Sequence, residues 1–160
     1  MHQHEKLITD FYTAFAARDA AAMARCYHPD IVFTDPVFPL LKGAEAGAMW
    51  AMLCGKAQDF SLTFSNVRAD DQQGTAHWEA KYLFSKTGRS VHNKIDAVFA
   101  FRDGLIVRHV DRFSFWNWAA QALGPKGVVL GWFPPVKGMV RKEAQKGLDI
   151  FQQKPPRQTP

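Results

Sequence analysis

The predicted fold depends most on one stretch, Cys26-Tyr27-His28-Pro29-Asp30-Ile31-Val32-Phe33-Thr34-Asp35-Pro36. A helical pattern ends at His28-Pro29, a short β-branched and aromatic run follows, and Asp35 then precedes a proline. Because proline pushes the preceding residue into extended geometry, Asp35 is predicted at the end of a short strand. Two interpretations of this carboxylate stay open here: turn chemistry alone, or one wall of a polar site.

Residues before and after this stretch show helical periodicity. Apolar positions from Glu5 to Arg18 recur every three or four residues, and a second short helix is predicted from Ala20 to Tyr27 with Asp19 as its N-cap. The strand Ile31–Asp35 follows. After a proline-containing loop, a third helix is predicted over residues 44–56.

Beyond residue 59 the pattern changes from helical to alternating. Strands are predicted over residues 60–69, 75–86, 91–102 and 105–115. The turns between them are short, and Asp103-Gly104 is typical of a tight hairpin. Strands joined in this way are antiparallel neighbours, so the chain is predicted to be α+β, with helices on one face of a four-stranded meander.

The C-terminal segment is predicted to be a helical extension. Helical patterns cover residues 116–123 and 136–151, and the apolar run 128–133 is expected to pack on the body of the protein or on a partner subunit. We therefore expect a domain over residues 1–118, an extension over 119–153 packed on the same domain, and a disordered, proline-rich tail over 154–160.

Length and composition fit a single domain with aromatic residues to spare. The chain has 160 residues, of which 47% are hydrophobic and 13% aromatic, enough to fill a core and line a cavity. The net charge is +5, with seven Lys or Arg against two acids after residue 125. No run combines clustered Arg with exposed aromatics, so we interpret this charge as solubility and expect no nucleic-acid partner.

Other features of the sequence favour a cytoplasmic protein without a membrane partner. No apolar run reaches the length of a signal peptide core or a membrane span. Cys26 and Cys54 lie in helical patterns and are predicted to be buried, reduced thiols. His, Cys and carboxylate spacings match no metal motif, and the sequence has no glycine-rich phosphate loop, so we expect neither metal nor cofactor.

Strand parity predicts which side chains share a cavity, because residues two apart face the same way. In the last strand, the face that carries Phe113 also carries His109 and Asp111. Ionisable groups among aromatic rings are costly unless they have partners or perform chemistry. One interpretation is therefore a buried hydrogen-bonded pair or a strand of opposite parity. The other is a pocket shared with Trp78, Tyr82 and Asn93, in which a carboxylate of raised pKa would suit proton transfer.

The order of these elements resembles the NTF2-like superfamily, and within it the SnoaL-like and ketosteroid-isomerase-like groups. The resemblance covers residues 5–118 and is carried by Phe11-Tyr12, Arg18-Asp19, Ala22-Met23, Cys26 to Asp30, Phe33 to Pro36, Lys42-Gly43 and Phe101 to Ile106. It implies a cystatin-like cone in which N-terminal helices pack on the concave face of a curved, mostly antiparallel sheet. It also implies a pocket that opens at one end and a homodimer formed through the outer face of the sheet.

The resemblance implies a catalytic role for Asp35, because this residue matches the aspartate that moves a proton between carbons in the steroid isomerases. The tyrosine of that family's oxyanion hole does not carry over, since Phe11 stands at its position and Tyr12 one residue away. The protonated aspartate is also missing, with Ala97 at its position and Asp96 beside it. We therefore expect no steroid isomerase with the usual oxyanion hole.

His109 and Asp111 resemble, by location, the strand from which SnoaL-like cyclases and related epoxide hydrolases draw an acid or base. The enzyme hypothesis is a cofactor-independent isomerase, cyclase, dehydratase or hydrolase acting on an apolar carbonyl-type or epoxide ligand, with Asp35, His109 and Asp111 as catalytic residues. The residues expected to bind this small molecule are Phe11, Tyr12, Trp50, Trp78, Tyr82, Asn93 and Phe113.

Two alternatives to the enzyme remain open. In a non-catalytic ligand-binding or dimerisation domain, the same polar residues would be satisfied parts of the core. In a basic-tailed adaptor, the C-terminal charge would dock other proteins.

Overall fold

The computed structural model describes residues 1–130 and 134–153. The predicted tail 154–160 and the end of the apolar run 128–133 lie outside the described residues. The helices are α1 (Gln3–Ala16), α2 (Ala20–Arg25), α3 (Ala44–Lys56), α4 (Phe115–Leu123), α5 (Pro125–Leu130) and α6 (Pro134–Gln153). The strands are β1 (Tyr27–Thr34), β2 (Leu41–Lys42), β3 (Gln58–Ala69), β4 (Gln73–Leu83), β5 (Ser90–Arg102) and β6 (Leu105–Arg112).

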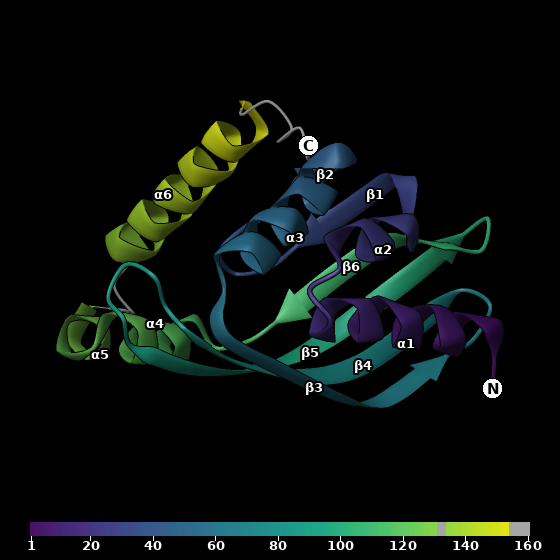
Figure 1. Ribbon diagram of the computed structural model, residues 1–160, viewed down its shortest axis with the longest axis horizontal. Coiled ribbons are helices and arrows are strands. Elements are labelled where there is room, and N and C mark those ends of the chain that lie inside the picture. Colours follow the sequence, from purple (N-terminus) through teal and green to yellow (C-terminus); the bar gives the residue numbers. More distant parts are fainter. Residues whose placement is uncertain (131–133, 154–160) are drawn as a thin grey trace, which may run out of the picture.

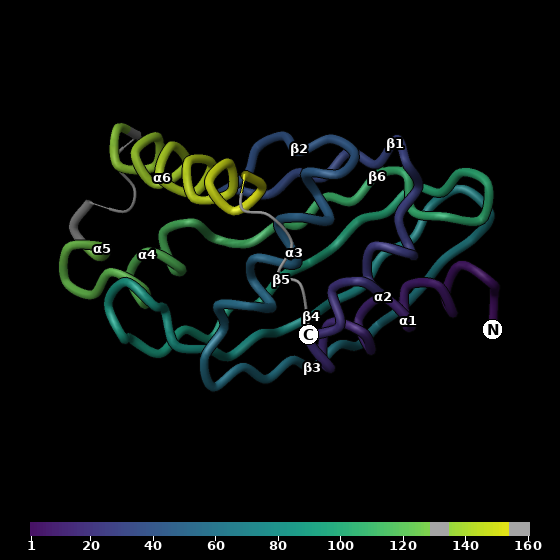
Figure 2. Tube along the Cα trace, turned by 45° about the horizontal axis from the view of Figure 1, so that its top comes forward, coloured from purple at the N-terminus to yellow at the C-terminus, as the bar shows by residue number. Residues whose placement is uncertain are grey.

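The sheet has six strands in the order β2-β1-β6-β5-β4-β3. Strands β3 to β6 form the predicted antiparallel meander, and β1 joins it parallel to β6. Helices α1, α2 and α3 cover one face of the curved sheet, α4 and α5 lie at one end of it, and α6 runs beside α3 (Figure 1). The tube view from a second direction shows the same arrangement (Figure 2). The predicted α+β architecture is confirmed.

The predicted boundaries around β1 are wrong. Helix α2 ends at Arg25, and β1 begins at Tyr27 rather than at Ile31. The reason is a non-local pairing, because Tyr27 lies opposite Ile106 of β6 and the register then shifts before Val32. Helical periodicity alone cannot reveal such a pairing. Tyr27 is thereby moved from a helix surface onto the inner face of the sheet.

The predicted end of the last strand is also wrong. β6 stops at Arg112, and Ser114 caps α4 by accepting a hydrogen bond from the backbone of Asn117 at 3.2 Å. Phe115 is therefore a helical residue, and Phe113 lies in the link between strand and helix. As a consequence, α4 turns back over the end of the sheet.

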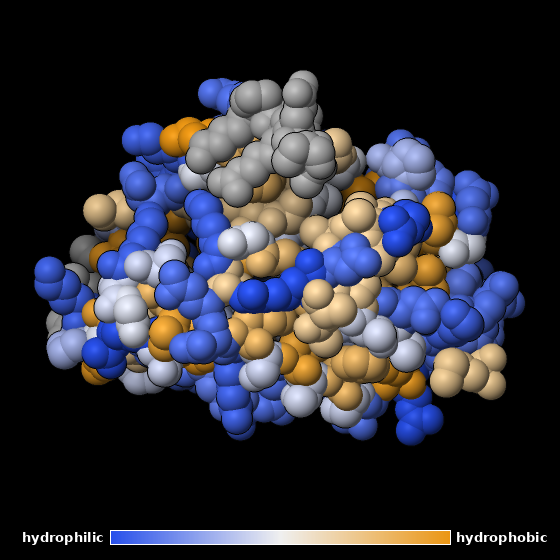
Figure 3. All heavy atoms as spheres, in the orientation of Figure 1, coloured by the Kyte–Doolittle hydropathy of each residue, from blue (hydrophilic) through white to orange (hydrophobic). Residues whose placement is uncertain are grey.

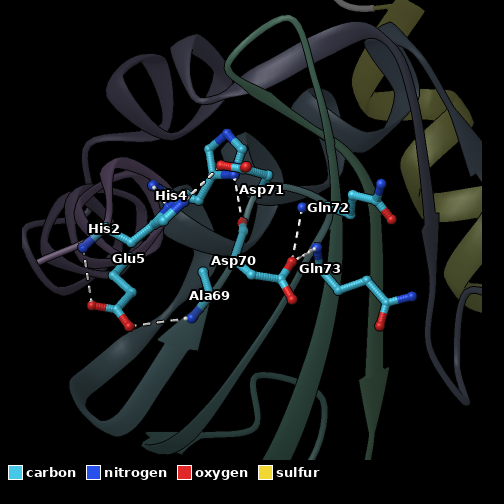
Figure 4. A network of polar contacts seen from close by, with 8 residues as sticks. All are labelled: His2, His4, Glu5, Ala69, Asp70, Asp71, Gln72 and Gln73. Atoms are coloured by element: carbon cyan, nitrogen blue, oxygen red, sulfur yellow. Dashed lines mark hydrogen bonds and ion pairs between the residues drawn. The ribbon is translucent and has the colours of Figure 1, made fainter.

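Polar contacts at the N-terminus hold α1 over the sheet. His4 lies against the β3–β4 turn, with its Nδ1 2.9 Å from the carbonyl of Asp70, and His2 contacts the Asp71 carboxylate at 2.9 Å (Figure 4). A Cβ on Gly74 would stand only 2.8 Å from Ile8, so glycine permits this close approach. The buried stripe of α1 is thereby fixed on the concave face; it consists of Ile8, Phe11, Tyr12 and Phe15.

Two groups of buried side chains make up the core. The main group lies between the sheet and helices α1 to α3, and the smaller one lies under α4 around Val91 and Trp118. Three half-buried residues contact both groups; they are Val37, Tyr82 and Phe113. We call these three the junction. Helix α6 contributes Leu148 to the main group and Val140 to the smaller one, so the extension packs on the domain body.

The surface is mixed in character. In the space-filling view, hydrophilic side chains are spread over the visible face with apolar ones between them (Figure 3). None of the helices within the described residues is both long enough and apolar enough to cross a bilayer. Both cysteines are free thiols, with Cys26 buried and Cys54 half-buried.

Candidate functional site

A chain of hydrogen bonds crosses the interior of the cone. Trp50 Nε1 donates to the Tyr27 hydroxyl at 2.8 Å, and that hydroxyl lies 2.8 Å from Nδ1 of His109. His109 Nε2 lies 2.9 Å from Oδ1 of Asp111, which also accepts a hydrogen bond from Trp78 Nε1 at 3.3 Å. We call these five residues the buried chain. They come from α3, β1, β6 and β4, so the whole fold is needed to assemble them.

One arrangement of protons gives each of these contacts a donor and an acceptor. The Tyr27 oxygen accepts the Trp50 N–H, so its own hydroxyl hydrogen donates to Nδ1 of His109. The imidazole then carries its proton on Nε2 and donates it to the Asp111 carboxylate. In this arrangement His109 is the Nε2–H tautomer, with Nδ1 as the acceptor of the Tyr27 hydroxyl hydrogen.

Burial of the chain is almost complete. His109 is 0% exposed and Asp111 is 3% exposed. The imidazole lies among aromatic rings, the nearest being Phe99 with a centroid distance of 4.5 Å. Burial raises the pKa of Tyr12 and Tyr27 well above their ordinary values, and the negative charge of Asp111 adds to this effect. The predicted inward parity of this strand is confirmed, and the pair is hydrogen-bonded within the core.

Asp35 forms the turn that its sequence indicates. Its Oδ1 accepts hydrogen bonds from the backbone N–H groups of Val37 at 2.7 Å and Phe38 at 2.6 Å, and its own N–H donates to the carbonyl of Phe38. This Asx-type turn follows directly from the Asp-Pro sequence. The turn holds one carboxylate oxygen in hydrogen bonds to the backbone, and the side chain is half-buried.

The same carboxylate is strongly perturbed. Burial raises the pKa of Asp35 from 3.8 to about 7, against the hydrogen bond from Phe38, which lowers it. The charge of Asp111 raises the pKa further, while the hydrogen bond from Val37 and the charge of Arg141 lower it. Asp35 is thus close enough to the buried chain to be influenced by Asp111, and it titrates in the physiological range.

The hydroxyl of Tyr82 is influenced by the charge of this carboxylate. Its oxygen accepts a hydrogen bond from Trp118 Nε1 at 3.0 Å, which leaves the hydroxyl hydrogen available for another acceptor. Burial raises the pKa of Tyr82, and the charge of Asp35 contributes to the shift. The charge of Asp35 thus acts on Tyr82, which belongs to the junction between the two core groups.

The residues predicted to bind a ligand fall into three places. Four of them pack around the buried chain or belong to it; these are Phe11, Tyr12, Trp50 and Trp78. Tyr82 and Phe113 belong to the junction. Asn93 lies apart from both, in a surface cleft of about 370 Å³ between β5 and α4, lined by His92, Asn93, Lys94, Ser114, Asn117, Ala120 and Gln121.

Tyr12 has an unpartnered buried polar atom, as His4 has at its Nε2. Tyr12 is 0% exposed, and its hydroxyl has no hydrogen-bond partner among the described residues. A buried hydroxyl without a partner costs free energy. The tyrosine is therefore available to a group that enters the core, and it stacks on Phe64 with a centroid distance of 5.5 Å.

Sequence reasoning missed two contributors to this site. Tyr27 links Trp50 to His109 but was predicted on a helix, and the only signal for it was its place next to a helix end. Trp118 holds Tyr82 from α4, a helix whose packing no local pattern indicates. Within the described residues, no group of three or more His, Cys, Asp or Glu side chains is arranged to hold a metal ion.

Comparison with known proteins agrees with this architecture. The model of the SnoaL-like domain family matches residues 8–109. No curated protein matches the sequence at a significant level. The similar solved structures described below are less than 25% identical in sequence to this chain, so they bear on the fold alone.

Three of these structures illustrate the likeness. An LEH-like epoxide hydrolase of M. tuberculosis has a TM-score of 0.64 and 17% identity, over 82% of this chain and 96% of that one. An NTF2-like protein of unknown function from Burkholderia pseudomallei has a TM-score of 0.66 and 17% identity, over 76% and 98%.

The third is a protein with a ketosteroid isomerase-like fold from Catenulispora acidiphila, solved in complex with trimethylamine. It has a TM-score of 0.65 and 14% identity, over 74% of this chain and 93% of that one. The family model spans well over half of the chain, from α1 into β6, and therefore includes Asp35, Tyr82 and His109. The chain belongs to the SnoaL-like domain family of the NTF2-like superfamily.

Proposed function

We propose that this protein binds an apolar small molecule at the junction and catalyses a cofactor-independent acid–base reaction on it, with Asp35 as the group that moves the proton. The reaction class is isomerisation, cyclisation, dehydration or hydrolysis of a carbonyl-type or epoxide compound. The proposal is supported by the half-buried Asp35 carboxylate, which accepts hydrogen bonds from the N–H groups of Val37 and Phe38, and by its burial, which raises its pKa to about 7. A group that is half protonated near neutral pH serves as acid or base equally well.

The chemistry requires a proton acceptor and an oxygen-binding donor on one side of the ligand. Asp35 in its ionised form takes a proton from the carbon next to a carbonyl, and in its protonated form it returns that proton at a second carbon. The hydroxyl hydrogen of Tyr82 is available to the developing oxygen anion, since the tyrosine oxygen is already held by Trp118. With an epoxide, protonated Asp35 would donate to the ring oxygen as the C–O bond breaks and water adds at carbon, and the carboxylate left on Asp35 would then take up the proton that the added water loses.

His109 and Asp111 support this reaction from inside the core. Both are sealed from solvent, so they act on the ligand through Asp35. The charge of Asp111 favours the protonated form of Asp35, and the hydrogen bonds from His109 and Trp78 hold that charge in place. We propose that the buried chain is a fixed electrostatic support that keeps Asp35 near neutrality.

The test is turnover of a panel of apolar ketones, lactones and epoxides, with deuterium exchange next to the carbonyl as a further readout. For a compound that the wild type converts, Asp35→Asn is expected to reduce the rate about 100-fold or more. Asp111→Asn should reduce it less. Asp30→Asn, which removes an exposed carboxylate from the preceding strand β1, serves as the matched control and should leave the rate unchanged. Equal turnover by wild type and Asp35→Asn would refute the proposal.

A second candidate is a non-catalytic ligand-binding or dimerisation domain, favoured by the closure of the core. All partners of His109 and Asp111 in the buried chain are satisfied within the protein, as expected of a structural network. The panel separates the two candidates. Compounds that bind without being converted, and bind Asp35→Asn equally well, would favour the second.

A further inference from the structure

The C-terminal helix α6 brings a cation to the turn that contains Asp35. This helix follows the residues matched by the family model, and it is held in place by Leu148, which is 0% exposed. Arg141 of α6 is half-buried, and its Nε donates to the carbonyl of Pro36 at 2.9 Å. Pro36 directly follows Asp35, and the charge of Arg141 acts on that carboxylate. The extension is therefore part of the surroundings of the candidate site.

The guanidinium of Arg141 has unused binding capacity. A guanidinium has five N–H donors in a planar fork, and the contact with Pro36 uses one of them. None of the ion pairs found among residues 1–130 and 134–153 involves Arg141. Asp35 does not form an ion pair with Arg141 either, since its carboxylate lies beyond ion-pair distance and is largely protonated below pH 7. A partly desolvated arginine that has free N–H donors and no ion pair binds an anion favourably.

The space next to Arg141 has the size and charge for such a group. A cleft of about 570 Å³ separates α6 from the loop before β2, within the range of small-molecule sites. It is lined by Pro39, Arg141, Lys142, Gln145, Lys146 and Asp149. Three cations against one carboxylate give the cleft a positive potential. Val140, one residue before Arg141 on α6, packs against the smaller core group, as does Val37 of the junction.

We propose that Arg141 is a specificity-determining residue that selects an apolar ligand bearing a carboxylate group. The carboxylate lies in the cleft on the N–H groups of Arg141, and the apolar body lies toward the junction, where Asp35 and Tyr82 meet it. Arg141 does not touch the reacting atoms. It positions the ligand and excludes neutral and cationic analogues. This inference rests on the proposed function, because it names the ligand class of the same site.

The test compares two probes of equal shape, 2-naphthoate and the neutral ketone 2-acetylnaphthalene, by calorimetric titration at pH 6. The wild type is expected to bind 2-naphthoate about tenfold more tightly. Arg141→Gln should weaken binding of 2-naphthoate about tenfold and leave the ketone unchanged. Arg141→Lys, which keeps the charge but loses the fork, should recover only part of the affinity. Lys81→Gln, an exposed cation on the outer face of the sheet, is the matched control and should change neither affinity.

Each result decides one proposal. Equal affinity of Arg141→Gln and wild type for 2-naphthoate would overturn the selection of a carboxylate, and so would an equal loss for both probes, since that indicates a structural role. In both cases, binding of the neutral ketone to the wild type still shows whether the ligand site exists. The proposed function is therefore tested independently of the role of Arg141. If the wild type binds neither probe, the ligand site itself is refuted, and the inference about Arg141 falls with it. Thermal unfolding of each variant checks that the helix stays packed.

Discussion

At the scale of single residues, the number of hydrogen-bond partners of a buried hydroxyl determines what its removal costs in stability. Tyr27 and Tyr12 are both almost fully buried and both lie near Asp111, yet the first has two hydrogen-bond partners and the second has none among the described residues. Removing a hydroxyl that satisfies two buried groups leaves both unsatisfied, whereas removing an unpartnered one leaves nothing behind. The two tyrosines therefore have opposite roles, structural and available.

This contrast predicts opposite effects of the same change. Tyr27→Phe should lower the free energy of unfolding by about 2 to 3 kcal/mol, because Trp50 Nε1 and His109 Nδ1 lose their partner. Tyr12→Phe should change it by less than about 0.5 kcal/mol in either direction. Urea unfolding at pH 7 measures both. A similar loss in the two variants would mean that Tyr12 has a partner in solution.

Asp35 makes a pH-dependent contribution to stability. Its pKa is raised from 3.8 to about 7 in the folded protein, so ionisation opposes folding. The contribution of this group is most favourable below about pH 4, falls as the pH rises from about 4 to about 7, and is constant above that. Its full size is no more than about 4 kcal/mol, reduced by solvent because the side chain is only partly buried.

Asp35→Asn removes this dependence and keeps an oxygen that can accept from Val37 and Phe38. We expect the variant to be more stable than wild type at pH 8 and nearly equal at about pH 4 or below, in chemical unfolding at the two pH values. Such a gain on removal of a functional group is typical of active sites. A variant that loses the same free energy at both pH values would show that the carboxylate is an ordinary turn residue.

At the scale of elements, α6 is the part that distinguishes this chain from the matched family region. It packs on α3 through Leu148, and it reaches the Asp35 turn through Arg141. Its outer side is exposed, with Ile150 49% exposed. The helix is therefore integrated into the fold on one stripe only, as its amphipathic sequence predicts.

Two substitutions on this helix test that integration. Leu148→Ala should destabilise the protein by about 2 to 4 kcal/mol, because it removes a fully buried side chain from the main core. Ile150→Ala, two residues away on the exposed side, should cost less than about 1 kcal/mol. Thermal unfolding measures both. Equally small effects would mean that α6 detaches from α3 in solution.

At the scale of the whole molecule, much of the fold followed from local patterns. The period-two alternation placed Trp78, Tyr82, His109 and Asp111 on the inner face, because each strand is long enough for its parity to be read. The Asp-Pro turn was equally local. The partner of His109 could not be foreseen, since Tyr27 reaches the sheet through a parallel pairing with a strand about 80 residues later.

The sequence also could not show which inward-facing side chains are enclosed in the core and which lie at the surface. Strand parity says which face a side chain takes, but the position along the strand decides whether it lies inside the cone. Asn93 has inward parity, yet it lies past the end of β6, where α4 and β5 leave a surface cleft. Likewise, the helical pattern after residue 134 indicates α6 without saying that Arg141 comes to rest on Pro36.

The predicted homodimer belongs to this scale and rests on the family resemblance. The outer face of the sheet carries a half-buried cross-strand pair, Val98 and Val110, beside a charged network that includes His77 and Asp96. Val110→Asp should convert a dimer to a monomer in light scattering coupled to size exclusion. Thr13→Asp, on the exposed side of α1, should not. A wild type that is monomeric at high concentration, or a dimer that survives Val110→Asp, would contradict the prediction.

The central claim is that Asp35 is held near neutrality by burial and by the charge of Asp111. The most direct measurement is a carbon-detected NMR titration of the aspartate carboxyl groups, assigned with Asp35→Asn. We expect a midpoint at about pH 7 for Asp35 in the wild type and a lower midpoint in Asp111→Asn, where the repelling charge is gone. A midpoint near pH 4 in the wild type would contradict it and would leave Asp35 as a turn residue.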